Sequence, residues 1–284
     1  METRVSSATR EVTIGDSQPT VLIGERINPA GKKKLAKALQ TGNLEIVRRE
    51  SLAQAQAGAD ILDVNVSTFG VDEVTLLPQA VKAVMDSVDI PLCLDSTNPE
   101  ALAAALRVYK GKPLINSVTG EEHSLDKILP LVKEHGAAVI GLVQDDEGIP
   151  KDSERRVAIA HKIVERAEAA GIPRQNIIID CLALAVGADT SSGLAAVETA
   201  SRVKAELGVN LTLAASNISF GMPDRHLLNS AFVVMVIASG VTCLIVDVAR
   251  ARPIVLAADL ILNRDKHARR YIEAYRQSKE KLAE

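Results

Sequence analysis

The residues best suited to chemistry in this sequence are carboxylates and carboxamides at the ends of short apolar runs. Asp95, Asn116 and Asp180 stand at such positions. Further polar residues of this kind are Glu25, Asp63, Asn65, Ser216 and Asn217. A ring of these groups presents mainly hydrogen-bond acceptors with some amide donors, which suits a planar, donor-rich heterocycle such as a 2-amino-4-oxopyrimidine. Because Asp, Asn and Ser also favour strand ends and helix N-caps, each single position has a structural explanation as well.

Asp180 gives the strongest indication of function among these residues. It follows Ile177 to Ile179 and precedes Cys181 and Leu182, so the carboxylate has apolar neighbours on both sides. A carboxylate in such surroundings is costly unless something pairs with it. We therefore expect Asp180 to bind a ligand.

Composition and spacing exclude other kinds of site. The formal net charge is −3, and the chain has three tyrosines, three phenylalanines and no tryptophan, so we expect no nucleic-acid partner. The five histidines show no HExxH or His-x-His spacing, and we expect no bound metal. No GxSxG elbow is present, which argues against a Ser/His/Asp hydrolase. The last two strand ends lack a glycine-rich cradle, so a phosphate substrate is disfavoured.

The elements that must position these side chains alternate along the chain. An apolar run ends in a polar residue, a turn follows, and a stretch of helical length comes next. The eight runs are Val21 to Gly24, Ile61 to Val66, Pro91 to Asp95, Pro113 to Ser117, Ala137 to Val143, Ile177 to Leu182, Leu211 to Ser216 and Cys243 to Val248. The helical stretches are Leu35 to Ala57, Val74 to Ser87, Pro99 to Tyr109, Leu125 to His135, Ser153 to Ala170, Gly193 to Leu207, His226 to Ser239 and Ile254 to Asn263. Eight such units favour a closed barrel over an open doubly wound sheet.

The predicted fold class is therefore α/β, with a single (β/α)8 TIM barrel in residues 20–284 and a C-terminal helical extension from Arg269 to Glu284. Residues 1–19 are polar and mixed in charge, and we expect them to form a flexible N-terminus without a signal or membrane segment. Cys93, Cys181 and Cys243 lie far apart in apolar runs, without the spacing of a disulfide framework. That pattern is typical of a reducing compartment, so we expect a cytoplasmic enzyme that does not associate with a membrane.

Six short segments together carry a family resemblance. They are Gly24-Glu-Arg-Ile-Asn28, Leu62-Asp-Val-Asn-Val66, Leu94-Asp-Ser-Thr-Asn98, Ile115-Asn-Ser117, Ile179-Asp180 and Ser216-Asn-Ile-Ser219. Taken in this order, they resemble the methyltetrahydrofolate:corrinoid methyltransferases, pterin-binding barrels related to the folate and cobalamin parts of methionine synthase. The similarity runs from about Val21 to Asn263. Each motif is weak alone, whereas the ordered set is specific.

The resemblance implies roles for individual residues. Asp95, Asn116 and Asp180 would hydrogen-bond the pterin ring, Asn217 would face its N5 atom as the catalytic residue, and Arg225 matches a pterin-site arginine. Around them, Glu25, Asp63, Asn65 and Ser216 are expected to support the ring-binding side chains. Phe220 departs from the family pattern, where a polar residue is expected beside N5 in the acetogen-type enzymes.

The implied reaction moves a methyl group between N5 of methyltetrahydrofolate and the cobalt of a corrinoid (cobalamin), carried by a partner protein or free. N5 must be protonated or strongly hydrogen-bonded as its bond to the methyl group breaks, and an Asn amide can provide that help. We expect no corrinoid-binding domain in this sequence, so the resemblance implies a corrinoid-binding partner protein, and it also implies a homodimer. The residues favour neither direction of transfer.

Other functions remain to be weighed. Dihydropteroate synthase is similar in fold and pterin site, but its Asn-x-Thr-Pro-Asp-Ser-Phe loop is absent, and Glu25-Arg-Ile-Asn-Pro29 stands in its place. A non-catalytic pterin-binding subunit of a methyltransferase complex is the alternative from another class. A zinc-dependent methylcobalamin:thiol transferase is disfavoured because its His/Cys ligand set is missing.

Overall fold

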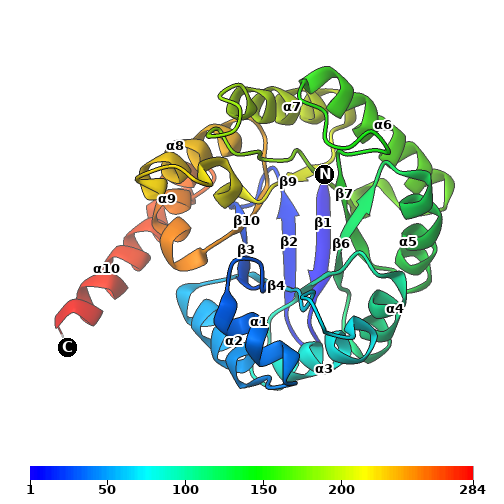
Figure 1. The fold of residues 1–284 in the computed structure, drawn as a ribbon. Helices are drawn as coiled ribbons and strands as arrows, with labels where there is room; N and C mark the ends of the chain where they lie inside the picture. The colour runs from blue at the N-terminus through cyan, green and yellow to red at the C-terminus, as the bar shows by residue number, and fades with distance from the viewer. Residues whose placement is uncertain (284) are drawn as a thin grey trace.

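A ring of eight parallel strands forms the centre of the protein in a computed structural model that describes residues 1–283 (Figure 1). The strands are β3 (Val21–Ile27), β4 (Ile61–Val64), β5 (Leu92–Asp95), β6 (Leu114–Thr119), β7 (Ala138–Leu142), β8 (Ile177–Asp180), β9 (Asn210–Thr212) and β10 (Cys243–Val246). Each strand from β3 to β8 pairs with the next along the chain, and β10 pairs with β3. A bridge between Ala214 and Ile245 joins the β9 and β10 segments and closes the ring. The predicted α/β barrel is confirmed.

Helices surround the ring of strands. They are α1 (Lys33–Gln40), α2 (Glu45–Ala57), α3 (Glu73–Met85), α4 (Pro99–Val108), α5 (Glu122–Glu134), α6 (Ser153–Ala169), α7 (Ser192–Leu207), α8 (Arg225–Ala238) and α9 (Val248–Ile261), with short 3-10 helices η1 (Arg174–Asn176), η2 (Ala215–Ser219) and η3 (Lys266–Ala268). Asp72, Asn98 and Asp152 cap α3, α4 and α6 by accepting backbone N–H groups of the first turn. The predicted continuous stretch from Leu35 to Ala57 is two helices. Gly42 interrupts it with a φ of +68°, a conformation that favours glycine.

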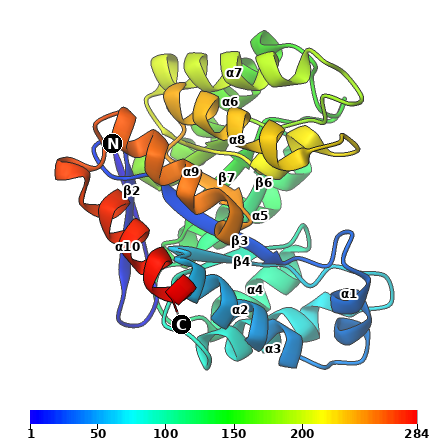
Figure 2. The same cartoon turned by 90° about the vertical axis from the view of Figure 1, so that its left-hand side faces the viewer.

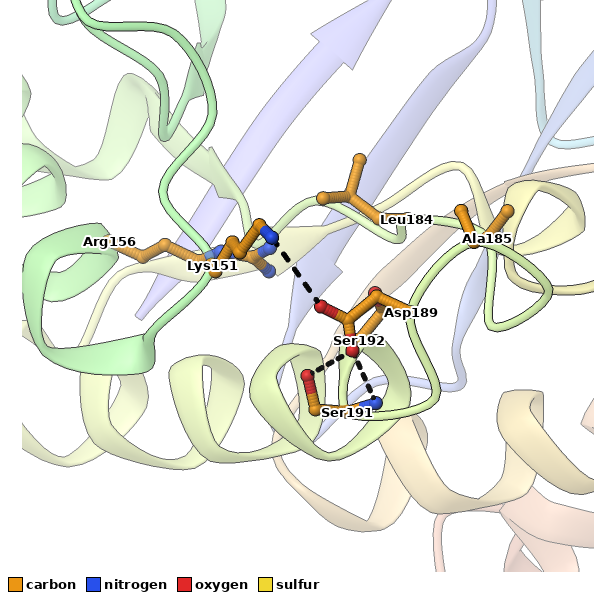
Figure 3. A pocket seen from close by; sticks show the side chains of 8 residues that line it. Lys151, Arg156, Leu184, Ala185, Asp189, Ser191 and Ser192 are labelled. Carbon is orange, nitrogen blue, oxygen red and sulfur yellow. Dashed lines mark hydrogen bonds and ion pairs between the residues drawn. The ribbon is translucent and has the colours of Figure 1, made fainter.

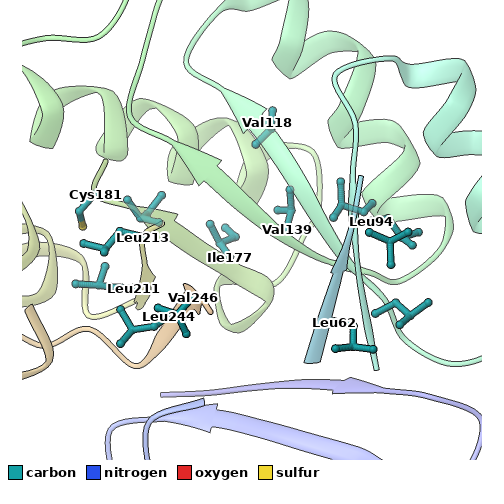
Figure 4. Close-up of a cluster of buried hydrophobic side chains, with 14 of the residues drawn as sticks. Leu62, Leu94, Val118, Val139, Ile177, Cys181, Leu211, Leu213, Leu244 and Val246 are labelled. Atoms are coloured by element: carbon teal, nitrogen blue, oxygen red, sulfur yellow. The ribbon is translucent and has the colours of Figure 1, made fainter. Parts of the chain in front are cut away.

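The apolar side chains of the strands divide between two cores. Residues such as Ile23 and Ile178 point into the barrel, whereas their neighbours Leu22 and Ile179 pack between the sheet and the helices. Figure 4 shows part of the outer core, including Leu62 and Leu94. Since strands buried on both faces need apolar side chains at successive positions, the continuous apolar runs of the sequence have their explanation here.

The N-terminal segment differs from the expected flexible end. Strands β1 (Glu2–Ser6) and β2 (Glu11–Gly15) form an antiparallel hairpin across the end of the barrel where the central strands begin (Figures 1 and 2). Val5, Val12 and Ile14 are buried in the interior core of the barrel. The alternation of apolar and polar residues in both short strands places these side chains on one face, and their burial orders the segment.

The predicted C-terminal helical extension is confirmed as α10 (Arg269–Ala283), which projects from the ring of helices (Figure 1). Asp265 accepts the backbone N–H groups of Arg270 and Tyr271, and Arg270 pairs with Asp259 of α9 at 3.4 Å. These contacts fix the start of α10 to the barrel. No helix within residues 1–283 is long and apolar enough to cross a membrane.

Candidate functional site

The polar strand ends predicted from sequence share one face of the barrel because all eight central strands run in the same direction. Asp95 and Asp180 are the last residues of β5 and β8, and Asn116 on β6 is the register partner of Asp95. Glu25 lies near the end of β3. The carboxyl and amide groups therefore gather at the mouth formed by the carboxyl ends of the strands.

Two carboxyl groups form the centre of this mouth. Asp63 of β4 is buried beside Asp95, and the Asn116 side-chain amide donates a hydrogen bond to Asp63 Oδ1 at 3.2 Å. Burial, together with the neighbouring charge of Asp95, raises the pKa of Asp63 well above its usual range. Burial also raises the pKa of Asp95 to about 6, against the opposing effect of hydrogen bonds from Asn65 and Asp63. Two adjacent buried carboxyls resist double ionisation, so the pair retains a proton around neutral pH.

Asp180 is the third buried carboxyl of the mouth, with 5% of its surface exposed. Burial raises its pKa to about 7, although a hydrogen bond from the Leu182 backbone N–H and the nearby Arg156 charge both oppose the rise. Because no cation hydrogen-bonds directly to it among the described residues, its acceptor capacity is open to the donors of a ligand.

Arg156 supports the segment that follows Asp180, and sequence reasoning did not identify it. Its side chain is fully buried in α6, and its Nη1 donates to the carbonyls of Cys181 and Leu182 at 3.2 and 3.0 Å, while Nε donates to Pro150 at 2.8 Å. The spacing to Ala160, Ile163 and Ala167 was an available signal, since it places Arg156 on the apolar face of the helix.

Arg156 also lines a cavity of about 400 Å³ at this face of the barrel (Figure 3). Nη2 of Arg156 finds no hydrogen-bond partner among residues 1–283. On the same cavity, Asp189 accepts hydrogen bonds from Ser191 and pairs with Lys151 at 4.0 Å. The cavity therefore has cationic and anionic groups on its walls.

Glu25 and Ser216 form the opposite part of the site. Ser216 Oγ lies 2.8 and 3.0 Å from the two carboxylate oxygens of Glu25 and donates to that carboxylate. Burial raises the pKa of Glu25, and the Ser216 hydrogen bond and the Lys32 charge limit that rise.

The expected strand from Leu211 to Ser216 is shorter, because β9 ends at Thr212 and η2 follows. Asn217 lies on η2 beside Ser216 and is exposed at the mouth.

Arg225 fixes the turn that carries Asn217. Arg225 donates from Nε to Ser219 Oγ at 3.0 Å and from Nη2 to the Ser216 carbonyl at 2.8 Å. The Arg225 guanidinium carbon also lies 5.7 Å from the centre of the Phe220 ring, whose side chain is 68% exposed. These contacts show Arg225 positioning η2, while its contact with a pterin stays a prediction.

The structure thus brings most of the predicted residues to one mouth in two groups, and Asp180 stands apart from both, with a hydrogen bond from the Leu182 backbone N–H. Asp63, Asn65, Asp95 and Asn116 form one hydrogen-bonded group. Glu25, Ser216 and Arg225 form the other, joined through Ser216. Within the described residues, no three His, Cys, Asp or Glu side chains are arranged to hold a metal ion.

By its fold the chain is a (β/α)8 barrel protein, and its buried carboxyl and amide groups lie at the carboxyl ends of the strands, where such barrels carry their sites. Within that class, the chain belongs to the pterin binding enzyme family, whose pattern matches residues 24–247.

Individual relatives agree with this assignment. The chain is 31% identical over 266 residues to the methylcorrinoid:tetrahydrofolate methyltransferase of Eubacterium limosum. The aligned region covers 91% of this chain and 97% of that protein. It is also 31% identical over 265 residues to the methionine synthase of Mycobacterium tuberculosis, covering 89% of this chain and 22% of that protein.

Solved structures share the fold. The dihydropteroate synthase of Yersinia pestis with a pterine-sulfa conjugate superimposes with a TM-score of 0.70 at 15% identity, covering 92% of this chain and 99% of that one. The dihydropteroate synthase of Xanthomonas albilineans in complex with 7,8-dihydropteroate gives a TM-score of 0.69 at 19% identity, covering 91% and 98%. At these identities the likeness shows the barrel fold alone.

Proposed function

We propose that this chain transfers a methyl group between N5 of methyltetrahydrofolate and the cobalt of a corrinoid (cobalamin), carried by a partner protein or free. The observation that carries the proposal is the 31% identity to the methylcorrinoid:tetrahydrofolate methyltransferase of Eubacterium limosum over nearly the full length of both proteins. The chemistry of the mouth supports the same substrate.

The carboxyl groups at the mouth fit a pterin ring. The 2-amino-4-oxopyrimidine part of a pterin offers N–H donors from the ring and the exocyclic amine, together with a carbonyl acceptor. Asp180 has the acceptor oxygens to take two of these donors, and Asp95 and Asn116 lie together across the mouth to bind the rest of the ring. A ligand with such donors would compensate the burial that raises the pKa values of these acids.

Asn217 is the proposed catalytic residue. The amide can donate a hydrogen bond to neutral N5 or accept one from protonated N5, so it can serve the ring in both states as the bond to the methyl group forms or breaks. Its place on η2, anchored by Arg225 and next to the Ser216–Glu25 pair, supports this role. When bound, the corrinoid supplies the cobalt that gives or takes the methyl group, and the protein contributes positioning and proton transfer.

Exposed apolar side chains around the mouth support docking of a corrinoid-binding protein. They lie on segments that join strands to the following helices or in the first turns of those helices. The residues are Phe69, Ile149, Leu194, Phe220 and Leu227. Since monomeric proteins rarely leave such groups gathered on one face, the mouth fits a partner that covers it.

Helix α8 supports the proposed homodimer. Its residues Phe232 and Val236 are buried against the barrel, while Val234 and Met235 in its second half are exposed on its outer side. A helix that is apolar on all sides is typical of an element buried on all sides.

The three free, buried cysteines support the proposed cytoplasmic location, because they suit a reducing compartment.

A single-turnover experiment tests the proposed function. Purified protein is mixed with methyltetrahydrofolate and cob(I)alamin, and transfer is followed through the cobalt absorbance. The expected result is loss of the cob(I)alamin spectrum that requires both protein and folate. Pterin binding without transfer would instead indicate a non-catalytic subunit, and condensation of a pterin pyrophosphate with p-aminobenzoate would indicate a dihydropteroate synthase.

A further inference from the structure

A basic cavity of about 440 Å³ lies beside the pterin mouth, around residues that follow β3. We name it the lysine cavity. Its cationic walls are Arg26, Lys32, Lys33, Lys34 and Arg49, and one acid, Glu50, stands among them. Glu50 lies 3.5 Å from Arg26 and 3.6 Å from Arg49, so this single acid is shared among the five cations that line the cavity. An excess of positive charge in one cavity favours an anionic ligand.

The lysine cavity is directly connected to the site described above. Lys32 Nζ donates to the backbone carbonyls of Glu25 and Asn28 at 3.1 and 3.0 Å. Glu25 in turn accepts from Ser216, which is the neighbour of Asn217 in the chain. A ligand at Asn217 that extends past Glu25 therefore reaches Lys32 and the cations around it.

Burial and the nearby charge of Arg26 lower the pKa of Lys32, against the opposing charges of Glu25, Glu50 and Asp247. The pterin mouth beside it is rich in acids, including Glu25, Asp63 and Asp95. The mouth therefore offers carboxyl acceptors whereas the lysine cavity offers cations, and a substrate with a donor-rich ring and an anionic tail matches both.

We propose that the lysine cavity binds the carboxylates of the glutamate tail of the folate, and that it favours tails of several glutamates. This inference rests on the proposed function. The tail of a folate is attached at C6, the ring atom next to N5. If N5 faces Asn217, the tail leaves the ring on the side of Ser216 and Glu25, toward the lysine cavity. Each further glutamate adds one negative charge that the cations of the cavity can bind.

Binding of three pterins by calorimetry tests this proposal: tetrahydrofolate with one glutamate, tetrahydrofolate with three glutamates, and 6-methyltetrahydropterin, which has no tail. We expect the triglutamate to bind wild-type protein on the order of tenfold more tightly than the monoglutamate at low ionic strength. The advantage should shrink in about 0.5 M salt because the cations are partly exposed to solvent.

The variant K33Q/K34Q/R49Q removes three cations from the outer wall and leaves Lys32 and Arg26 in place. It should bind 6-methyltetrahydropterin like wild type and lose most of the advantage of the triglutamate. The control variant K37Q/K110Q/K127Q removes the same charge at exposed positions outside the cavity and should keep that advantage.

Equal affinity of wild type for the two folates, or an unchanged triglutamate advantage in K33Q/K34Q/R49Q, would overturn the tail site while leaving the methyltransferase proposal intact. If that variant kept the advantage but lost methyl transfer to a corrinoid protein and not to free cob(I)alamin, the cavity would be a protein-docking surface, and the tail site would be wrong. Failure of wild type to bind any of the three pterins would contradict the proposed function itself.

Discussion

Asp180 has opposite effects on stability and on the proposed binding. Its folded-state pKa of about 7 lies above the ordinary value of 3.8, so the folded protein binds the proton more tightly than the unfolded chain. Stability therefore falls as pH rises from about 4 to about 7, and above pH 7 the full cost of the buried charge is present.

Asp180→Asn should consequently stabilise the free protein at pH 8 by roughly 1 to 3 kcal/mol, with little difference from wild type at pH 4. The same change should weaken pterin binding by roughly 1.5 to 3 kcal/mol, because a charge-assisted pair is lost. Urea denaturation at the two pH values and calorimetry with tetrahydrofolate measure both effects. Unchanged folate affinity would remove Asp180 from the ring site.

Pterin affinity should depend on pH for the same reason. Below pH 7 a proton on Asp180 removes an acceptor oxygen, so wild-type affinity for 6-methyltetrahydropterin should fall by up to about tenfold per pH unit. Asp95 has a pKa of about 6, so its protonation at lower pH should decrease the pterin affinity further. Asp180→Asn should lack the first step of this decrease. A flat wild-type profile between pH 8 and pH 6 would contradict the proposal that ionised Asp180 holds the ring.

Substitution of Asn217 tests whether this residue acts in the methyl-transfer step or only in folate binding. Asn217→Ala should lower the single-turnover rate of methyl transfer to cob(I)alamin by about 10² or more, because the transition state loses assistance at N5. Folate affinity should fall much less, since Asp95, Asn116 and Asp180 still bind the ring. A rate and an affinity that fall together would mean that Asn217 only shapes the turn, and a wild-type rate would exclude it from the mechanism.

At the scale of secondary-structure elements, the N-terminal hairpin is part of the barrel core. Asn210, the first residue of β9, donates from Nδ2 to Thr3 Oγ1 and to the Ile14 carbonyl, which joins the hairpin to the barrel. Ile14 is fully buried in the interior core, whereas Thr13 is partly exposed on the other face of the strand.

Ile14→Ala should therefore lower the free energy of unfolding by roughly 2 to 4 kcal/mol, through lost burial and the cavity left behind. Thr13→Ala serves as the control and should change it by less than about 0.5 kcal/mol. Urea denaturation followed by circular dichroism measures both variants. If the two behaved alike, the hairpin would not contribute to the core in solution.

At the scale of the whole molecule, the apolar outer side of α8 predicts association. Met235→Glu places a charge at a position that is 50% exposed and should convert a homodimer into a monomer in sedimentation at micromolar concentration. Leu52→Glu, at a 44% exposed position on α2, is the matched control and should stay dimeric. A wild-type protein that sediments only as a monomer would exclude the homodimer.

Much of the barrel and the mouth could be predicted from the sequence because their signals are local. A strand buried on both faces needs a continuous apolar run, and a helix that packs on one face needs apolar residues every three to four positions. The alternation of these two patterns along the chain therefore identifies the strands and helices directly. Since parallel strands end on one face, the positions of Asp95 and Asp180 at strand ends, with Asn116 in register with Asp95, place all three at one mouth.

The remaining features depend on contacts between residues far apart in the chain. The residues at positions 63 and 95 are both polar strand ends in the sequence, and only the pairing of β4 with β5 and their burial in the folded barrel place them side by side and raise their pKa values. Arg156 resembles a surface arginine until α6 packs it under the Cys181 and Leu182 carbonyls. The N-terminal strands are too short to be distinctive alone, and they become ordered because the open end of the barrel offers them apolar surface to bury. The sequence by itself thus determined the elements and their polar ends, whereas burial and distant contacts, which exist only in the folded chain, decided how those groups pair and titrate.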